Sequence, residues 1–380
     1  MEVVIKLQEI EKKDKLAVVG AGDFQRKLII KAKQKGMETH VFAWEYDDAG
    51  EQEADYFYPI SIVEKEQILE KCREINPVGI ISIASDLAVV AVNYVAEKLG
   101  LTGNGIKSTL ITTNKYFMRK TFERRGDPSP RYISSDELTD DLMKMLHLPL
   151  IIKPVDRSGN RGVTKISDRT EIEKAVSEAK NVSFEKKAII EEYVDGQEYS
   201  VEYISWKGKH TFLALTQKFT TGEPYFVETG HVQPAKVPVE TLQKIQEIVQ
   251  HALDSLLIKN GASHSEIKIT PSGDIKIIEI GARMGGDCIG SDLVQISTGY
   301  DYIDMVIDIA CGKEPSFKKI CKGQRAEIQF ILNQEDLRKF EEIKSVKPEC
   351  IYYVSELRKP EEGKKVRDST DRCGYYIMQG

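Results

Sequence analysis

The chain has 380 residues, of which 41% are hydrophobic and 30% charged, and this length can bury a core across two or three domains. Its formal net charge of −6 argues against nucleic acid as the main partner, because surfaces that bind nucleic acid are usually basic. The sequence has no apolar run of about 20 residues to span a bilayer, and its six cysteines form neither a CxxC pair nor a zinc-binding spacing. The N-terminus mixes both charges and lacks the long apolar core of a secretory signal. We therefore expect a cytoplasmic protein with free thiols, no membrane partner and no nucleic-acid partner.

Residues 1–112 alternate apolar strands with helices. KLAVVGAG, which begins at Lys15, is predicted to be a buried strand, and VGIISIAS at 78–85 is another. The helix that follows is predicted to end at Gly100, a typical C-cap residue. This alternation predicts a parallel sheet with right-handed crossovers, so we expect a Rossmann-like N-terminal domain. GAGDFQ lacks the third glycine of a dinucleotide fingerprint, which leaves a tight turn or a helix N-terminus that faces a small anionic substrate.

The rest of the chain is richer in predicted strands. NKYFMRKTFERRG is predicted to be a basic amphipathic helix that ends at Gly126, and LPLIIKPVDRSGNRGVTKI is predicted to form a strand, a loop and a strand. A long helix is predicted from Thr241 to Gly261, closed by Asn260 and Gly261. We expect three further structural units after residue 112, which span 113–195, 196–315 and 316–380. The last of them is expected to be a small β-rich subdomain.

Two glutamates lie in a predicted hairpin at 263–287, SHSEIKITPSGDIKIIEIGARMGGD. If the turn is centred between Ser272 and Gly273, Glu266 lies directly opposite Glu279 on one face, with Cβ atoms about 5 Å apart. Like charges in this position are destabilising unless something neutralises them.

Several arrangements could neutralise this pair. One acid could stay protonated, Lys268 on the same face could pair with one of them, or a divalent cation could bridge both. Two solvated glutamates on an exposed hairpin are the simpler alternative. Mg²⁺ typically takes one or two carboxylates together with phosphate oxygens. The flanking glycines and Arg283 favour an anionic ligand, because glycine lets the backbone approach closely and arginine is a fixed cation.

A glycine-rich loop, DRSGNRGV at 156–163, lies between two predicted strands. Its amide groups could fold over phosphate oxygens, although it lacks the Lys-Ser/Thr ending of a Walker loop. Lys153 before it and Lys115 on the earlier basic helix could supply positive charge for phosphate. A plain hairpin loop is the alternative for this segment alone.

These motifs, in this order, resemble those of the ATP-grasp superfamily of carboxylate–amine ligases. The resemblance covers the chain from Lys15 to about Gly312 and rests on NKYFMRKTFERRGDPSP, LIIKPVDRSGNRGV, IIEEYVDGQEYSVE and HSEIKI…IIEIGARMGGD. It implies an ATP-grasp fold, mixing α/β and α+β, with a Rossmann-like pre-ATP-grasp domain, a lid subdomain and a small β-rich C-terminal subdomain.

The resemblance also implies a set of ATP contacts, in which lysines hold phosphates, the glycine-rich loop covers them as a mobile lid, and an acidic stretch meets adenine and ribose. They are Lys115 and Lys153 for the phosphates; Ser158, Gly159, Asn160 and Gly162 in the loop; Glu191 and the backbone of Glu192 and Val194 for adenine; and Glu198 for the ribose hydroxyls.

The same resemblance assigns Glu266 and Glu279 to Mg²⁺, with Mn²⁺ as an alternative, and members normally bind two ions. Many members carry Asn two residues after the second acid. This chain has Gly281 there, so the third side-chain ligand is absent or replaced.

FVETGHVQPA at 226–235 and the EIGAR stretch resemble the L-amino-acid ligase branch. There Glu228 and His231 would line the acceptor or acyl site, and Arg283 would bind the transferring phosphate or a substrate carboxylate. A surface-loop histidine is the alternative for His231. Together with Lys115, these are the expected catalytic residues.

The implied activity is an ADP-forming ligation, in which ATP phosphorylates a carboxylate and an amine attacks the acyl phosphate. Small-molecule carboxylate and amine substrates are implied, and a homodimer is expected because dimers are common among similar enzymes. Two alternatives stay open. One is a purine-biosynthesis ligase similar to glycinamide ribonucleotide synthetase, which would need a phosphate pocket near GAGDFQ, and the other is a non-catalytic ATP-binding sensor.

Overall fold

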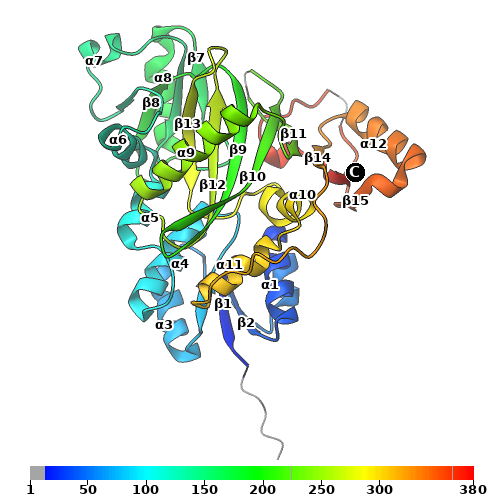
Figure 1. The fold of residues 1–380 in the computed structure, drawn as a ribbon. Helices are drawn as coiled ribbons and strands as arrows, with labels where there is room; N and C mark the ends of the chain where they lie inside the picture. The colour runs from blue at the N-terminus through cyan, green and yellow to red at the C-terminus, as the bar shows by residue number, and fades with distance from the viewer. Residues whose placement is uncertain (1–12, 224, 362) are drawn as a thin grey trace, which may run out of the picture.

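The computed structural model describes residues 13–223, 225–361 and 363–380, and three β-sheets organise them (Figure 1). Most of the N-terminus that was compared with a secretory signal lies outside the described residues. The N-terminal sheet, blue in Figure 1, lies below a large central sheet, and the lid sheet lies above and to the left. The C-terminal segment, orange and red, lies on the opposite side of the central sheet from the lid.

The N-terminal sheet is parallel. In one of its two inner strands, residues Leu16 to Val19 are fully buried, which explains the continuous apolar run in the sequence. In spatial order the strands are β3 (Tyr56–Tyr58), β2 (Glu38–Phe42), β1 (Lys15–Val19) and β4 (Gly79–Ile81). The helices are α1 (Asp23–Gln34), α2 (Ala49–Glu53), α3 (Lys65–Ile75) and α4 (Asp86–Leu99). The predicted C-cap of α4 is confirmed, since Gly100 has a φ of 68°.

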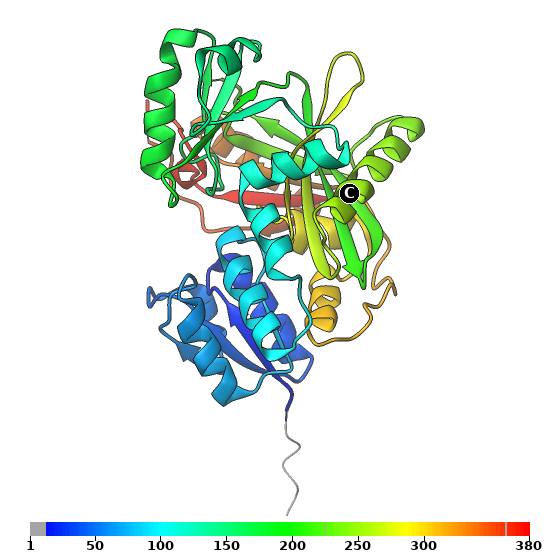
Figure 2. The ribbon, with the colours of Figure 1, turned by 90° about the vertical axis from the view of Figure 1, so that its left-hand side faces the viewer.

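Helices α5 (Ile106–Thr113) and α6 (Lys115–Arg125) lead from the N-terminal sheet to the lid, as Figure 2 shows from the side. The predicted basic helix is α6, and it ends at Gly126 with a φ of 79°. The lid sheet is antiparallel, and β6 and β7 confirm the predicted strand–loop–strand. Its elements are β5 (Tyr132–Ser134), α7 (Asp140–Lys144), β6 (Leu150–Pro154), β7 (Thr164–Ile166), η1 (Arg169–Glu171), α8 (Ile172–Val182) and β8 (Ala188–Glu192).

The central sheet carries the long hairpins of the chain. Its strands, in spatial order, are β13 (Ile275–Gly281), β12 (Gly261–Ile269), β9 (Gln197–Trp206), β10 (Lys209–Thr220), β11 (Glu228–Gln233), β14 (Ala326–Phe330), β16 (Tyr375–Gln379) and β15 (Ile351–Val354). Helix α9 (Val239–Ser255) packs on it through Ile245, Val249 and Leu253, which are fully buried. The remaining elements are the π-helix η2 (Ile289–Leu293), α10 (Val294–Thr298), α11 (Tyr302–Ala310), α12 (Gln334–Val346), η3 (Pro348–Cys350) and η4 (Ser369–Asp371).

The predicted end of α9 at Asn260 and Gly261 is wrong, because the helix ends at Ser255. Asn104 of the N-terminal domain accepts hydrogen bonds from the N–H groups of Lys259 and Asn260. These long-range bonds hold the segment outside the helix, and no local sequence signal announces them.

The C-terminal segment extends the central sheet, because β14 pairs with β11 and β16 pairs with β14. The loops between its strands therefore approach side chains that the central hairpins carry. No helix in the described ranges is both long and apolar enough to cross a membrane.

Candidate active site

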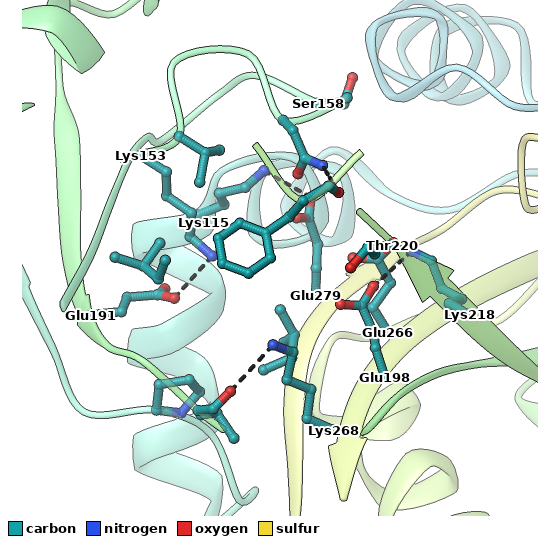
Figure 3. A pocket seen from close by; sticks show the side chains of 18 of the residues that line it. Lys115, Lys153, Ser158, Glu191, Glu198, Lys218, Thr220, Glu266, Lys268 and Glu279 are labelled. Atoms are coloured by element: carbon teal, nitrogen blue, oxygen red, sulfur yellow. Dashed lines mark hydrogen bonds and ion pairs between the residues drawn. The ribbon is translucent and has the colours of Figure 1, made fainter. Parts of the chain in front are cut away.

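A cavity of about 180 Å³ lies between the lid and the central sheet (Figure 3). Its wall brings together most of the residues that sequence reasoning selected. They are Lys115, Lys153, Ser158, Gly159, Asn160, Glu191, Glu192, Val194, Glu198, Glu228, Glu266, Glu279 and Arg283. Gly162 and His231 do not belong to the described lining.

Glu266 of β12 and Glu279 of β13 lie directly opposite each other, which confirms the predicted facing pair. The predicted turn centre between Ser272 and Gly273 is nevertheless wrong. Near the turn the pairing is centred on Ser272, and a bulge then adds Ile278 to β13. The extra residue restores the opposition of the two acids.

Each acid is held by a lysine from another element (Figure 3). Lys115 Nζ, at the start of α6, lies 2.8 Å from Glu279 Oε1. Lys218 Nζ, on β10, lies 2.7 Å from Glu266 Oε1. Lys268, the expected partner of one acid, instead donates to the carbonyl oxygen of Val194 at 3.2 Å. The pairing with Lys268 is therefore wrong, and two different lysines neutralise the acids.

Lys218 is shared by three carboxylates. Its Nζ also lies 2.8 Å from Glu198 Oε1 and 3.8 Å from Glu228 Oε1, and the residue is only 5% exposed. Burial lowers the pKa of Lys218, but the three acids outweigh burial and raise it well above its usual value. Burial alone would raise the pKa of Glu266, yet Lys218 and His264 hold it well below its usual range. These two cations therefore favour the ionised form of Glu266.

His264 lies beside Glu266 on the same strand face. Its Nδ1 is 2.5 Å from Glu202 Oε1 and its Nε2 is 3.6 Å from Glu266 Oε1. Burial lowers the pKa of His264, but Glu202 raises it to about 9 overall. Glu202 is fully buried and also accepts a hydrogen bond from the Gly285 N–H. The imidazole is thus fixed between two carboxylates.

A second group of buried charges forms the lid side of the cavity. Glu191 Oε1 lies 2.9 Å from Arg119 Nε, and Glu191 Oε2 lies 2.9 Å from Lys153 Nζ. Burial raises the pKa of Glu191, but the two cations lower it further than burial raises it. Burial also lowers the pKa of Lys153. Arg119, which sequence reasoning missed, donates to the Ile278 carbonyl and so ties this group to the hairpin that carries Glu266 and Glu279.

The glycine-rich loop and the Glu192 side chain at the rim of the cavity already have hydrogen-bond partners within the chain. Asn160 Nδ2 donates to the carbonyl of Phe226 at 3.3 Å, so the loop reaches across the cavity. The side chain of Glu192 accepts a bond from the His147 N–H, and its own N–H donates to the Arg131 carbonyl.

Arg283 is held by Asp86, the first residue of α4. Burial opposes charge on Arg283, but Asp86 raises its pKa further above the ordinary value. A Cβ atom at Gly281 would lie 2.9 Å from Asp86 Oδ1. The space of the expected third ligand is therefore filled by this ion pair.

Glu228 and His231 both lie on β11 but face different surroundings. Glu228 lines the cavity and pairs with Arg372 of the C-terminal segment at 2.8 Å. His231 is fully buried, so the alternative of a surface-loop histidine is wrong. Its Nε2 lies 3.7 Å from Asp287 Oδ2.

The donor set fits a hard divalent cation only in part. Glu266 and Glu279 offer facing carboxylates, but the described residues contain no group of three or more acidic, histidine or cysteine side chains arranged to hold a metal. Mg²⁺ typically needs one or two carboxylates when phosphate oxygens complete its shell. The two acids therefore suit a cation that arrives with a phosphorylated ligand.

The site residues missed by the sequence reasoning are Arg119, Glu202, Lys218, His264, Asp287 and Arg372. Lys218 had the clearest signal, a lysine within the alternating strand LTQKF. Its partners lie on neighbouring strands and become visible only when the strand order is known.

Comparisons with known proteins agree with this geometry. Residues 146–292 match the profile of the ATP-grasp domain. The chain is 27% identical to an alanine–anticapsin ligase of Bacillus subtilis (strain 168), over 69% of this chain and 62% of that protein. It is 26% identical to a D-alanine–D-alanine ligase of Azobacteroides pseudotrichonymphae, over 48% of this chain and 59% of that protein. The matches thus span only about three fifths of these relatives.

Solved structures show the same fold across nearly the whole chain. An L-amino acid ligase from Bacillus licheniformis has a TM-score of 0.80 and 21% identity, over 97% of this chain and 94% of that chain. A phosphoribosylglycinamide synthetase from Anaerococcus prevotii has a TM-score of 0.76 and 21% identity with the same coverage. The fold is that of these ligase structures, in which a Rossmann-like domain precedes the part of the chain that matches the ATP-grasp profile. Residues 146–292 are thus similar to an ATP-grasp domain, and the curated relatives named above are amino-acid ligases.

Proposed function

We propose that the chain is an ATP-dependent carboxylate–amine ligase that acts on amino-acid-like substrates and releases ADP and phosphate. The observation that carries the proposal is the opposition of Glu266 and Glu279 in a cavity that also holds Lys115, Lys218 and Arg283. Two facing acids surrounded by cations suit the triphosphate end of a nucleotide better than a purely structural hairpin. The similarity to alanine–anticapsin ligase supports amino acids as the substrate class.

The proposed reaction has two steps. A carboxylate oxygen of the first substrate attacks the γ-phosphorus of ATP, the bond to the β,γ-bridging oxygen breaks, and ADP leaves. The amine of the second substrate, as the free base, attacks the acyl carbon, and phosphate leaves with the former carboxylate oxygen. The nitrogen loses one proton, so an amide, ADP and phosphate are formed. Phosphorylation is needed because a carboxylate has no good leaving group of its own.

The side chains contribute positioning and charge compensation. Lys115 and Lys218 now hold the two acids and would share their charge with the phosphates of a bound nucleotide. Arg283 would meet the transferring phosphoryl group, with Asp86 fixing its guanidinium. When bound on Glu266 and Glu279, Mg²⁺ or Mn²⁺ would offset phosphate charge.

The nucleotide would lie between the lid and the central sheet. Lys153 and the loop around Ser158 would contact the phosphates, and the stretch from Glu192 to Val194 would meet adenine. The carboxylate of Glu198 would accept hydrogen bonds from the ribose hydroxyls. The carboxylate of Glu191 is already paired with two cations, so we assign it to fixing Lys153 rather than to adenine.

A purine-biosynthesis activity has less support. It would need a phosphate pocket at the first strand–helix turn, and Gln25 lies across that turn. Gln25 Nε2 donates to the carbonyl of Ile83 at 2.5 Å, and Asp23 adds negative charge at the helix start. The likeness to phosphoribosylglycinamide synthetase concerns the fold.

The test is product formation from ATP, Mg²⁺ and pools of proteinogenic amino acids. We expect ADP and phosphate only when a carboxylate and an amine are both present, with amide detected by mass spectrometry. No ADP with any carboxylate would favour an ATP-binding sensor, and AMP as product would contradict the acyl-phosphate route. A cytoplasmic location fits the six free cysteines, and a homodimer is a further prediction that analytical ultracentrifugation would test.

A further inference from the structure

A second cavity, of about 350 Å³, lies between helices α4 and α5 on one side and the lid on the other. We call it the α4–α5 groove, and its apolar wall consists of Leu87, Val90, Ile106, Leu110 and Phe184. All of these except Leu87 have exposed fractions between 37% and 58%, although they are large and apolar. A single exposed apolar side chain is ordinary, but a group gathered around one cavity points to a binding site.

The α4–α5 groove is continuous with the cavity that carries the proposed reaction. Lys115, Ser158 and Glu279 line both the groove and the nucleotide cavity (Figure 3). Asp86, the partner of Arg283, also lines the groove. A molecule whose carboxylate lies beside Lys115 and Glu279 can therefore place the rest of its chain among apolar side chains.

The groove follows α5 along the whole helix. Ile106, the first residue of α5, and Thr113, the last, both line it. Lys115 follows two residues after Thr113, so the helix runs away from the reaction centre toward Ile106. At a rise of 1.5 Å per residue, Ile106 and Thr113 are roughly 10 Å apart along the helix axis. This distance exceeds the length of a leucine or isoleucine side chain.

The polar side chains of the groove wall already donate hydrogen bonds within the chain. The hydroxyl groups of Thr109, Thr112 and Thr113 each donate to a carbonyl oxygen of the preceding turn. Asn114 Nδ2 donates to Glu185 Oε1 at 2.8 Å. Because these donors are used, the wall offers little to a polar tail and favours an apolar one.

The glycine-rich loop forms the junction between the groove and the nucleotide cavity. Arg157 lines both, and its guanidinium lies 4.1 Å from the ring centre of Phe184. Its carbonyl oxygen accepts a hydrogen bond from Lys115 Nζ at 2.8 Å. Two cations thus lie where an anionic head group would meet an apolar tail.

We propose that the α4–α5 groove binds the tail of the carboxylate substrate, and that this substrate carries an extended, uncharged apolar chain. A charged inner end joined to an apolar wall matches an amphiphilic small molecule with an anionic head better than the apolar strip of a partner protein. The inference rests on the proposed function and deepens it, because it names the class of carboxylate. It makes Leu110, in the middle part of α5, a specificity-determining residue.

The experiment compares L-2-aminooctanoate with L-alanine, which has the same head group and a shorter apolar side chain. Binding to the full chain is measured by calorimetry with Mg²⁺ and a non-hydrolysable ATP analogue, and ADP release from ATP is measured separately. For the wild type we expect L-2-aminooctanoate to bind at least about tenfold tighter than L-alanine, because its added methylene groups leave water. Free L-lysine should gain no such advantage, since its side-chain ammonium group would lose its hydration in the groove.

Substitutions at Leu110 locate the tail. Leu110→Gln keeps a long side chain with good helix propensity and makes it polar, so it should bring the ratio of the two affinities close to one. Leu110→Met should keep most of the ratio, because methionine is apolar and of similar size. Val239→Gln is the matched control, because Val239 is an apolar side chain of α9 that is 71% exposed. It should leave the ratio unchanged.

The proposal is overturned if L-2-aminooctanoate fails to bind the wild type or binds no tighter than L-alanine. That result would mean that the groove does not admit a tail when nucleotide is bound. It is also overturned if the tenfold advantage survives in Leu110→Gln, since the tail would then lie elsewhere. ADP release by the wild type with any amino-acid pair separates these failures from a failure of the ligase proposal, because ligation does not require the tail to lie in this groove.

Discussion

Asp86 and Arg283 join the N-terminal domain to the central sheet through a two-point ion pair. Arg283 Nε lies 2.9 Å from Asp86 Oδ1, and Arg283 Nη2 lies 3.0 Å from Asp86 Oδ2. A Cβ atom at Gly281 would lie 2.9 Å from Asp86 Oδ1 and 3.3 Å from Arg283 Cζ. The pair therefore explains why a glycine stands two residues after Glu279, the second of the two facing acids.

The first prediction tests this relationship with Gly281→Ala. The new methyl group should force Asp86 and Arg283 apart and lower kcat/KM at least about tenfold, or roughly 1.4 kcal/mol. In an Asp86→Ala background the same change should cost much less, because the closest clash, with Asp86 Oδ1, is gone. A double-mutant cycle on kcat/KM measures the coupling. Gly105→Ala is the control, since its Cβ would make only an ordinary contact. Equal losses in both backgrounds would contradict the steric account.

Glu279→Gln should abolish turnover and leave the fold intact. The amide keeps the shape and can still accept a bond from Lys115, but it removes a charge from the facing pair. We expect at least about a 100-fold loss of kcat and a weaker Mn²⁺ titration followed by electron paramagnetic resonance. Glu247→Gln, an exposed change on α9, serves as control. Mn²⁺ affinity and activity near those of the wild type would remove Glu279 from the metal site.

Lys218→Met should lower both the activity and the stability of the protein. It removes the cation shared by Glu198, Glu228 and Glu266, so those acids would repel one another as well as the nucleotide. We expect kcat/KM to fall at least about 100-fold and the melting temperature to drop. Lys209→Met, at the exposed start of the same strand, should change neither. Wild-type activity in the Lys218 variant would show that Lys218 is dispensable.

Asp287 should contribute to stability in a pH-dependent way. Burial alone would raise its pKa, but His231 and Arg372 hold it below the usual value of 3.8. A depressed carboxylate pKa adds stability above the unfolded-state pKa, and this stability is lost as the pH falls toward the folded-state pKa. Asp287→Asn should thus cost about 2 kcal/mol in urea unfolding near pH 6. The difference from the wild type should shrink below about pH 4. A difference that stays constant over this range would contradict the assignment.

Local sequence patterns predicted the features that depend on neighbouring residues. The alternation in the hairpin predicted that Glu266 faces Glu279, but with the true turn centre this opposition also requires the bulge at Ile278, which the sequence did not predict. The glycine C-caps at Gly100 and Gly126 follow from the need for a left-handed residue at a helix end.

The missed features depend on contacts between distant segments. Lys218 acquires its role from acids on β9, β11 and β12, which become its neighbours only through the strand order. Arg372 lies 144 residues from Glu228 in the sequence, and no local pattern links them. The early end of α9 has the same origin, since Asn104 of another domain fixes the segment that follows.

The most direct test of the account follows oxygen from the carboxylate substrate. The protein is given an amino acid labelled with ¹⁸O in its carboxylate, together with ATP, Mg²⁺ and the amine, and phosphate is examined by ³¹P NMR. An acyl phosphate requires one labelled oxygen in the inorganic phosphate for each amide formed, with ADP as the nucleotide product. Label in AMP, or amide formed with unlabelled phosphate, would contradict it.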